Sequence, residues 1–313
     1  MMRPAIPTRG TGPEGARSHS RTVPVSVLLV VLATGACQDE TPVASPGPSP
    51  AGSTDDVVLT TEPEPEPVPV FPTADTTGVP EGVRLSPTES VTVTEDGAVL
   101  DGLHVRGRII VEADDVVIRN TLVESDTSLA PLHVTRGTTG VLIEDVEVDN
   151  QGGSGIGIFL QGSATVRRVD VHSAEDGIRI NADDVLVEDS YIHDLSRLPD
   201  GHHDCIQIRS GNAVTIRGNS LQAYVAARDD PMNAAVQIGS LSGEDQISEL
   251  QVVGNLMNGG NYTVNGGGRE EVESARYAEN RFGRDFRFGV VGNLQNSVWE
   301  DSNVWHDTGE PVQ

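Results

Sequence analysis

The sequence predicts an all-β solenoid, in which short parallel strands stack coil upon coil. From about residue 97 the chain repeats one short strand pattern, with steps of 21 to 36 residues between successive starts. A period in the low twenties that contains only strands and turns is typical of solenoids. Within each repeat Val, Ile and Leu alternate with polar residues, as a half-buried strand requires. The repeats start at Val116, Val141, Ala164, Val185, Val214, Leu250, Ala275 and Val298.

Composition agrees with this fold and limits the partners. Aromatic residues make up 4% of the chain and 34 residues are glycine, which favours a core of stacked aliphatic side chains. The formal net charge is −26, and all 21 basic residues are arginine. Such a chain is a poor ligand for nucleic acid or for an anionic membrane surface. The two cysteines belong to no CxxC pair, so no zinc or redox motif is predicted.

Residues 1–36 have the pattern of an export signal. Arginines precede an apolar run from Val23 to Ala33, which is too short to span a bilayer comfortably. A cysteine directly after Gly35-Ala36 resembles a bacterial lipobox, although Thr34 stands where that pattern usually has leucine. We expect lipidation of Cys37 and anchoring on the outer face of the cell membrane, with simple secretion as the alternative.

Residues 37–80 are predicted to form a disordered linker. The segment is rich in Pro, Glu, Ser, Thr and Gly, and it contains an alternating acid–proline run at Glu62–Pro67. Such a composition cannot bury a core and should be extended and self-repelling. Residues 81–313 would then form one β-helix domain.

Four asparagines recur at one place in the later repeats: Asn219, Asn255, Asn280 and Asn303. Stacked asparagines at a coil bend resemble the asparagine ladder of right-handed β-helices. The domain also resembles a group of exported bacterial β-helix proteins within the pectate-lyase-like superfamily. The motifs that carry this likeness are Tyr191-Ile192-His193-Asp194-Leu195, His202-x-Asp204-x-Ile206-Gln207, Asn258–Val264, Asn280–Arg284 and Asn303–Gly309.

The resemblance implies a single-stranded right-handed parallel β-helix of about eight to nine coils over residues 85–313. The superfamily includes polysaccharide lyases, glycoside hydrolases, esterases, epimerases and phage adhesins, so the fold alone does not decide the activity. A phage-type adhesin would be a trimer, and the lipobox with its acidic tether argues against that class. We expect a monomer that meets an extracellular polysaccharide.

Aligned strands predict one outward-facing polar column that suits a sugar chain running across the coils. In each strand the flanking apolar residues, such as Ile206 and Ile208, point inward. The alignment also puts Cys205 on the outer face, beside Gly177 and Ala235. A solvated sheet face is the alternative interpretation. The predicted column is His133, Gly157, Arg179, Gln207, Gln237 and Arg287.

The loop that leads into this column carries the sharpest cluster, Asp200-Gly201-His202-His203-Asp204. His193 opens the same loop, and His172 lies one coil earlier, so these two imidazoles should stack. Histidine can act as a general base at neutral pH, and a carboxylate can orient it. Asp204 could equally cap a turn. We assign catalysis to His202, Asp204, His193 and Arg179, and substrate binding to His133, Gln207, Arg209, Gln237, Asp200 and His203.

Three reaction schemes stay open at this stage. A lyase would use Arg179 or Arg209 to neutralise a uronate carboxylate and a histidine to take the proton, and this scheme is favoured. A hydrolase would need two carboxylates, for which Asp176 and Asp204 lie one coil apart. A binding or structural module would need neither. Asp229-Asp230 on the longest loop could bind Ca²⁺, although such a pair is more often solvated.

Overall fold

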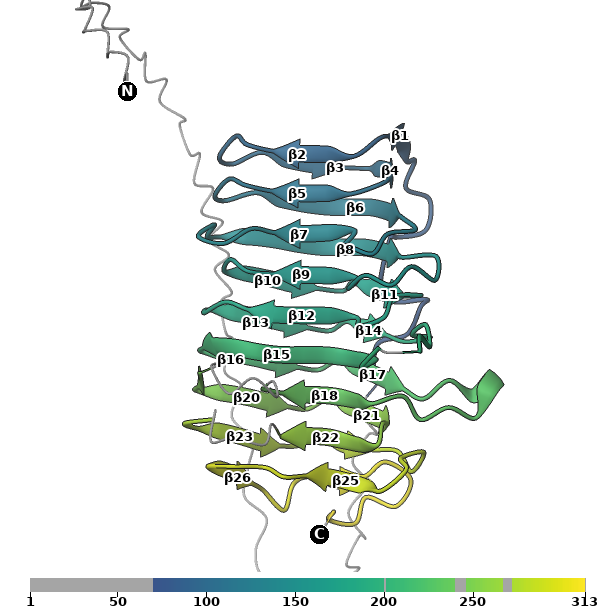
Figure 1. Cartoon of the computed structure of the whole chain (residues 1–313), viewed down its shortest axis with the longest axis vertical. Coiled ribbons are helices and arrows are strands. Elements are labelled where there is room, and N and C mark those ends of the chain that lie inside the picture. Colours follow the sequence, from purple (N-terminus) through teal and green to yellow (C-terminus); the bar gives the residue numbers. More distant parts are fainter. Residues whose placement is uncertain (1–69, 200, 240–245, 267–271, 313) are drawn as a thin grey trace, which may run out of the picture. The chain divides into compact units, whose positions relative to one another are not determined.

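The computed structural model describes residues 70–199, 201–239, 246–266 and 272–312. These residues form strands that stack in parallel along one axis, with a single turn of 3₁₀ helix at Ala226–Arg228 (Figure 1). Among them, no helix has the length and apolar character needed to cross a membrane. The predicted all-β solenoid is therefore confirmed.

One face of the solenoid is a parallel sheet, which we call sheet 1. Nine strands of the described chain follow one another in it, so the described chain makes nine coils. A further short strand, β19 (Ile247–Ser248), pairs with β15 at the edge. The nine strands are β2 (Val91–Val93), β5 (Ile109–Val111), β7 (Leu132–Val134), β9 (Ile158–Leu160), β12 (Ile178–Asn181), β15 (Asp204–Asn212), β18 (Ala234–Ile238), β22 (Tyr262–Gly266) and β25 (Gly289–Gly292).

The other two faces are joined through the long strands β6 (Val117–Glu124) and β8 (Val141–Asp149). We call these faces stack 2 and stack 3. Besides β6 and β8, stack 2 contains β3 (Val99–Asp101), β10 (Ala164–Arg167), β13 (Val185–Glu188), β16 (Val214–Arg217), β20 (Leu250–Val253), β23 (Ala275–Ala278) and β26 (Ser297–Trp299). Stack 3 contains β1 (Ser86–Thr88), β4 (Leu103–Arg106), β11 (Asp170–His172), β14 (Tyr191–Ile192), β17 (Ser220–Ala223), β21 (Leu256–Gly259), β24 (Arg281–Phe282) and β27 (Val304–Trp305).

A residue in the left-handed conformation turns each coil from stack 2 into stack 3. Asn120, Asp145, Arg168 and Asp189 hold this position with φ between 48° and 55°, and Gly218 and Gly254 follow them. Left-handed backbone bends the chain within one residue, and Asn, Asp and Gly tolerate it best. The bend therefore recurs in register and keeps the coils aligned.

The predicted asparagine ladder lies directly after this bend and is confirmed. Each side chain is fully buried, and its Nδ2 donates to the Oδ1 of the next at 2.9 Å, 3.0 Å and 2.9 Å. Each Nδ2 also donates to a main-chain carbonyl, for example Asn219 to Val187 at 3.0 Å. The ladder satisfies backbone groups that the bend removes from the strand pairing.

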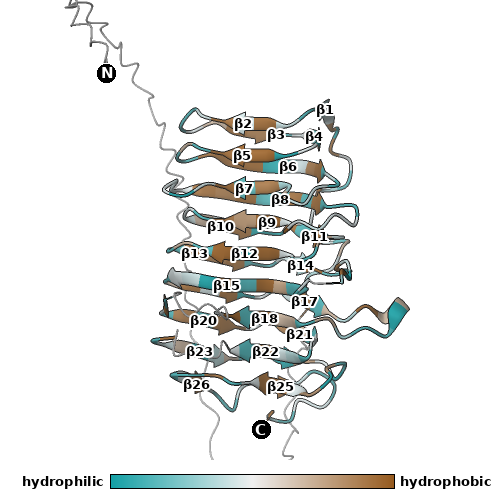
Figure 2. Ribbon diagram, viewed as in Figure 1, coloured by the Kyte–Doolittle hydropathy of each residue, from teal (hydrophilic) through white to brown (hydrophobic). Residues whose placement is uncertain are grey.

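The core is a continuous column of aliphatic side chains between the three faces. Ile178, Ile180, Ile206 and Ile208 are fully buried, as the alternation predicts. Figure 2 shows apolar colour along β5, β7 and β12, with hydrophilic residues in the turns. Burial of stacked Val, Ile and Leu at roughly 1.5–3 kcal/mol each supplies the main stabilising free energy.

The segment before the first coil lies against stack 3. The Gly78 N–H donates to the Arg168 carbonyl at 2.9 Å, and Thr77 is buried. A Cβ at Gly78 would lie 3.1 Å from Asp170 Cβ, so the contact is close. The folded part therefore includes residues 70–80, which composition alone had assigned to the linker. Residues 1–69, with Cys37, lie outside the described residues.

Candidate functional site

The outward column of sheet 1 exists, with two changes in its membership. Strand register places Phe159 opposite both His133 and Arg179, and Gln207 and Gln237 follow. The predicted place of Gly157 was wrong by two residues. Its amide donates to the Asp176 carbonyl at 2.8 Å, and a Cβ there would lie 2.5 Å from a Val171 methyl.

Arg287 does not continue the column. Asn265 of β22 pairs with Gln237, and its Nδ2 donates to Gln237 Oε1 at 2.8 Å. Gly292 then follows Asn265 in register. Arg287 precedes β25 and donates to Asn261 Oδ1 at 2.8 Å instead. The C-terminal half of the column is therefore a strip of side-chain amides.

The N-terminal half of the column borders a hollow of about 280 Å³. Its chemistry is mixed, with two guanidinium groups, one carboxylate, an aromatic floor and an apolar rim. Glu175 is the single carboxylate among the lining residues of the described chain. The lining consists of Arg108, Ser128, Leu129, Ala130, His133, Ser154, Gly155, Ile156, Phe159, Glu175 and Arg179.

The floor and one wall of the hollow are held in place by short contacts. The rings of His133 and Phe159 stack with centroids 5.1 Å apart. His133 Nε2 lies 2.9 Å from Gln161 Oε1, which fixes the imidazole. Arg108 Nε donates to the Ala130 carbonyl at 2.7 Å, and burial lowers the pKa of this guanidinium. Such a flat ring pair beside cations suits a sugar ring that carries negative charge.

Three carboxyl groups lie close together just before β12: Glu175, Asp176 and Asp204. Asp176 is fully buried, and its Oδ2 accepts from Arg179 Nη2 at 2.6 Å. Its Oδ1 accepts from the Asp204 main-chain N–H at 2.9 Å. Burial, and then the charge of Asp176, raises the pKa of Glu175. Glu175 therefore holds a proton more readily than an exposed carboxyl group does.

Asp204 is fully buried beneath this group. Asn233 donates to its Oδ1 at 2.7 Å and Gln207 Nε2 lies 3.4 Å from its Oδ2. Burial and the neighbouring Asp176 hold the pKa of Asp204 well above its ordinary value of 3.8. The carboxyl group is thus an enclosed partner of the site, and it holds a proton more readily than an exposed carboxyl group does.

The histidine loop divides into one exposed and one buried imidazole. His202 is exposed, and its main-chain N–H donates to Glu175 Oε1 at 3.1 Å. His203 is fully buried, with Leu198 N–H donating to Nε2 at 2.8 Å and Arg197 Nη1 3.0 Å from Nδ1. Burial and then the Arg197 charge lower the pKa of His203. Asp200 lies outside the described residues.

His193 contacts a different set of residues, at the end of β14. It sits after β14, where Nε2 is 2.9 Å from Asp170 Oδ1 and Nδ1 is 2.7 Å from Asp194 Oδ2. Burial alone would lower its pKa, but these two acceptors raise it. His172 packs against it with ring centroids 5.4 Å apart, as predicted. This second cluster belongs to stack 3.

Four buried polar atoms of sheet 1 have no hydrogen-bond partner among the described residues. They belong to two neighbouring coils, those of β12 and β15, and include both donors and acceptors. Buried groups of this kind are where water or a ligand hydroxyl binds. Arg209 contributes one of them from the bulge that interrupts the pairing of β12 and β15. The atoms are Arg179 Nε, Asn181 Oδ1, Gln207 Oε1 and Arg209 Nε.

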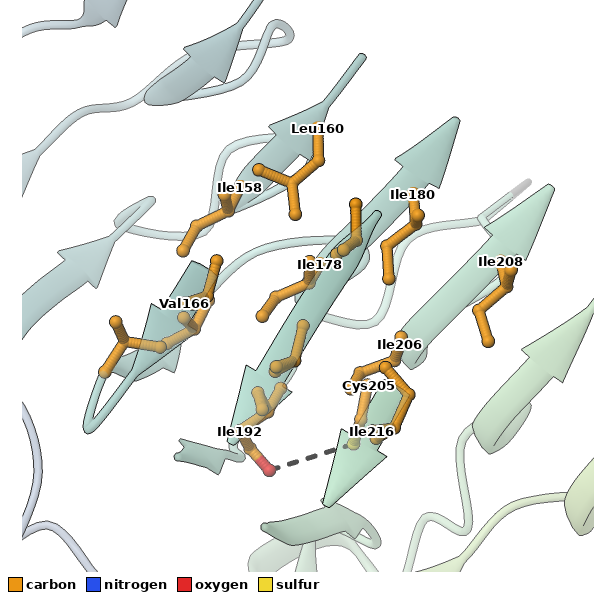
Figure 3. Close-up of a cluster of buried hydrophobic side chains, with 14 of the residues drawn as sticks. Ile158, Leu160, Val166, Ile178, Ile180, Ile192, Cys205, Ile206, Ile208 and Ile216 are labelled. Atoms are coloured by element: carbon orange, nitrogen blue, oxygen red, sulfur yellow. Dashed lines mark hydrogen bonds between the residues drawn. The ribbon is translucent and has the colours of Figure 1, made fainter. Parts of the chain in front are cut away.

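Cys205 points into the core, and its predicted place on the outer face was wrong. Its Sγ lies 3.7 Å from the Ile192 carbonyl oxygen, among aliphatic side chains (Figure 3). The same position is Gly177 and Ala235 in the neighbouring coils, because the bend into sheet 1 leaves room only for small inward side chains. Burial raises the pKa of the thiol well above its usual range, so it is a poor nucleophile.

The acidic pair of the longest loop is engaged by other side chains. Asp230 accepts from Arg197 Nε at 2.8 Å, and Asp229 Oδ1 accepts from the Tyr224 hydroxyl at 2.8 Å. No group of three or more His, Cys, Asp or Glu side chains in the described chain could hold a metal ion. Ca²⁺ binding at Asp229-Asp230 stays a prediction.

Sequence reasoning missed Arg108, Phe159 and Glu175. Phe159 was hidden because Gly155-Ile156-Gly157-Ile158 fits the strand pattern in two registers, and only the second pairs Ile158 with Ile178. Glu175 precedes Asp176 in a turn, where an acid usually looks solvated. Arg108 gives a signal in hindsight, since it directly precedes a buried strand one coil before His133.

Comparison with known proteins agrees with the architecture. The family model described as a right-handed β-helix region matches residues 82–264, more than half of the chain. A search of curated proteins gives no match. The matched segment spans the coils from β1 to β22 and contains the hollow and the carboxylate group. The chain therefore belongs to the right-handed parallel β-helix family, consistent with its resemblance to pectate-lyase-like proteins.

Proposed function

We propose that this protein binds a uronate-containing polysaccharide across sheet 1 and cleaves it by β-elimination. The observation that carries the proposal is the hollow itself, where Arg108 and Arg179 share a lining with Glu175 and the His133–Phe159 ring stack. Two guanidinium groups in a pocket of an acidic protein are a specific feature, since the bulk charge of −26 would repel a polyanion. The pocket supplies locally the charge that the whole surface lacks.

The chemistry needs three groups, and the site offers each. A guanidinium from Arg179 or Arg108 neutralises the uronate carboxylate, which acidifies the proton on C5. His202 takes that proton, the C4–O bond breaks, and a double bond forms between C4 and C5. Glu175, whose pKa is raised by burial and then by the charge of Asp176, gives a proton to the leaving oxygen. His202 and Glu175 are adjacent through the hydrogen bond to the His202 amide.

Hydrolysis is less well supported by the geometry. A glycoside hydrolase needs two carboxyl groups that flank the sugar, about 5 to 9.5 Å apart. Asp176 and Asp204 are fully buried and joined through the Asp204 amide, so no sugar fits between them. Glu175 alone among the described lining residues offers a carboxyl group to the hollow.

Export and lipid attachment form the second part of the proposal. The support is the sequence of residues 1–37, where arginines precede a short apolar run and Gly35-Ala36-Cys37. A lipidated Cys37 followed by the acid–proline segment would hold the β-helix away from the membrane surface.

The test uses the full chain, incubated with polygalacturonate, alginate and an uncharged galactan, with and without Ca²⁺. We expect the ultraviolet absorbance of an unsaturated uronate to rise with one acidic polymer and not with the galactan. Glu175→Gln should slow cleavage by about 10²- to 10⁴-fold, since general acid catalysis contributes that much. Arg217→Ala, an ion-pair variant on stack 2, is the control and should keep full rate. If the protein retains the polymer and releases no product, cleavage is contradicted and a binding function is supported instead.

A further inference from the structure

Two loops meet beside the hollow, and each contributes an arginine to the contact. The first loop links β14 to β15, and the second links β17 to β18 and projects from the stack of coils (Figure 1). Arg197 of the first loop donates through Nε to Asp230 Oδ2 at 2.8 Å, and its Nη2 contacts Asp230 Oδ1. Arg228 of the second loop contacts the first loop, since its Nη2 donates to the Leu195 carbonyl at 3.0 Å. The two loops therefore form one structural unit.

From Arg197 a chain of contacts leads to the hollow. Arg197 Nη1 lies 3.0 Å from His203 Nδ1. Gly201 fills the gap between His203 and Glu175, since a Cβ there would lie 2.5 Å from His203 Nε2 and 2.9 Å from Glu175 Oε1. The adjacent His202 amide donates to the same Glu175 oxygen at 3.1 Å. A displacement of Arg197 would therefore reach the carboxyl group that lines the hollow.

We infer that Arg197 is a positioning residue, which joins the two loops and thereby fixes His202 and Glu175 at the hollow. The inference rests on the proposed function for its effect on turnover, but the coupling of the loops does not. The second loop also supports the site directly, because the Asn233 side chain donates to Asp204 and its main-chain N–H donates to the His203 carbonyl at 3.1 Å.

Arginine suits this position for a geometric reason. Its planar guanidinium reaches both oxygens of Asp230 through Nε and Nη2, while Nη1 lies 3.0 Å from His203 Nδ1. A lysine has one ammonium and could satisfy Asp230 alone. Burial and then the charge of Arg197 lower the pKa of His203, which favours the neutral ring. A neutral ring can accept the Leu198 N–H.

The experiment compares Arg197→Ala, Arg197→Lys, Asp230→Asn and the Ala/Asn double variant with Arg217→Ala as the matched ion-pair control. Hydrogen–deuterium exchange is measured at the amides of both loops, including Leu198, His202 and Asn233. Rates of uronate cleavage are measured against pH. We expect faster exchange in both loops for Arg197→Ala and for Asp230→Asn, with no further rise in the double variant. Arg217→Ala should leave both loops unchanged.

The pH profile separates positioning from general stability. Loss of the His202 amide removes a hydrogen bond that lowers the pKa of Glu175, so the alkaline limb of kcat should move to higher pH. kcat should fall by up to about a hundred-fold with a smaller change in KM. Arg197→Lys should restore the slow, wild-type exchange of amides near Asp230. It should not return the alkaline limb of kcat to its wild-type pH.

The outcomes distinguish this inference from the proposed function. Two results in Arg197→Ala would together overturn the positioning role. Faster amide exchange would be confined to residues 193–199, and the alkaline limb of kcat would stay at its wild-type pH. If the wild type cleaves no uronate, the proposed function fails. Faster exchange of both loops and of the His202 amide in Arg197→Ala would then still support the coupling of the loops. Faster exchange in the first loop alone would overturn it.

Discussion

At the scale of single residues, burial decides which acid can take part in chemistry. Asp176 is buried in contact with Arg179, Asp204 is enclosed without a cation of its own, and Glu175 stands half-buried at the hollow. Carboxyl groups thus have three different environments within two neighbouring coils. The sequence indicated that acids gather here, but burial depends on the loops above them, which a linear pattern does not reveal.

The state of Asp204 predicts a pH dependence of stability. Its pKa in the folded protein is raised above 3.8, so the folded state binds this proton more tightly than the unfolded state does. The free energy of unfolding should therefore fall as pH rises above that value, by about 1.4 kcal/mol per pH unit until the folded carboxyl ionises. Asp204→Asn should remove this slope.

The measurement is urea unfolding of both proteins over a range of pH. An asparagine at 204 can still accept from Asn233 and can donate to the unpartnered Gln207 Oε1. We expect the variant to gain stability relative to the wild type as pH rises. A difference that stays constant with pH would contradict a protonated Asp204.

At the scale of elements, register explains both the success and the errors of sequence reasoning. The ladder asparagines and inward isoleucines recur at fixed places, so the period predicted their positions. Gly157 and Cys205 were misplaced because glycine fits either register and because two successive inward residues at a bend break the alternation. The stacking of His172 and His193 was predictable, since they hold equivalent places in neighbouring coils.

On stack 2, strand register places acidic and basic side chains next to each other in neighbouring coils. Acids and arginines alternate along one column through six coils, so each arginine has a carboxylate in a neighbouring coil. Arg119 lies 2.8 Å from Asp101, and Arg167 lies 2.6 Å from Glu144. Exposed pairs contribute about 0–1 kcal/mol each, so the column favours correct stacking more than it stabilises. The column is Asp101, Arg119, Glu144, Arg167, Glu188 and Arg217.

The asparagine ladder should be far more sensitive than this surface column. Asn255→Ala would leave the Asn219 Nδ2, the Asn219 N–H and the Ile216 carbonyl without their buried partner. We expect a loss of about 2–4 kcal/mol in the free energy of unfolding, since each buried unsatisfied group costs about 1–3 kcal/mol. Gln251→Ala, half-buried on β20 of the same coil, is the control. Equal midpoints in urea for the two variants would show that the ladder contributes nothing special.

At the scale of the whole molecule, an acidic β-helix carries a hollow lined by Arg108, Arg179 and Glu175. The bulk charge disfavours polyanions, and in our proposal the two arginines offset it at this place. The period predicted the β-helix, whereas the hollow depends on Arg108, Phe159 and Glu175 meeting from three coils. Such a meeting follows from register and loop packing together, which explains why the fold was predictable and the site only in part.

The N-terminal region gives a prediction at this scale. If Cys37 is lipidated, Cys37→Ala should move the protein from the membrane fraction to the soluble extracellular fraction of its producing cell. Fractionation followed by immunodetection measures this, and Cys205→Ala is the control because that thiol is buried. Equal membrane association of the wild type and Cys37→Ala would contradict a lipid anchor.

The most direct test of the central claim is calorimetric binding of short oligouronates to the Glu175→Gln protein. The account predicts that galacturonate or alginate oligomers bind, that uncharged galactose oligomers do not, and that Arg108→Gln weakens binding by about ten-fold or more, as loss of a charge-assisted contact implies. High salt should weaken it further. Binding that is equal for charged and uncharged oligomers, or unaffected by Arg108→Gln, would contradict a uronate site in this hollow.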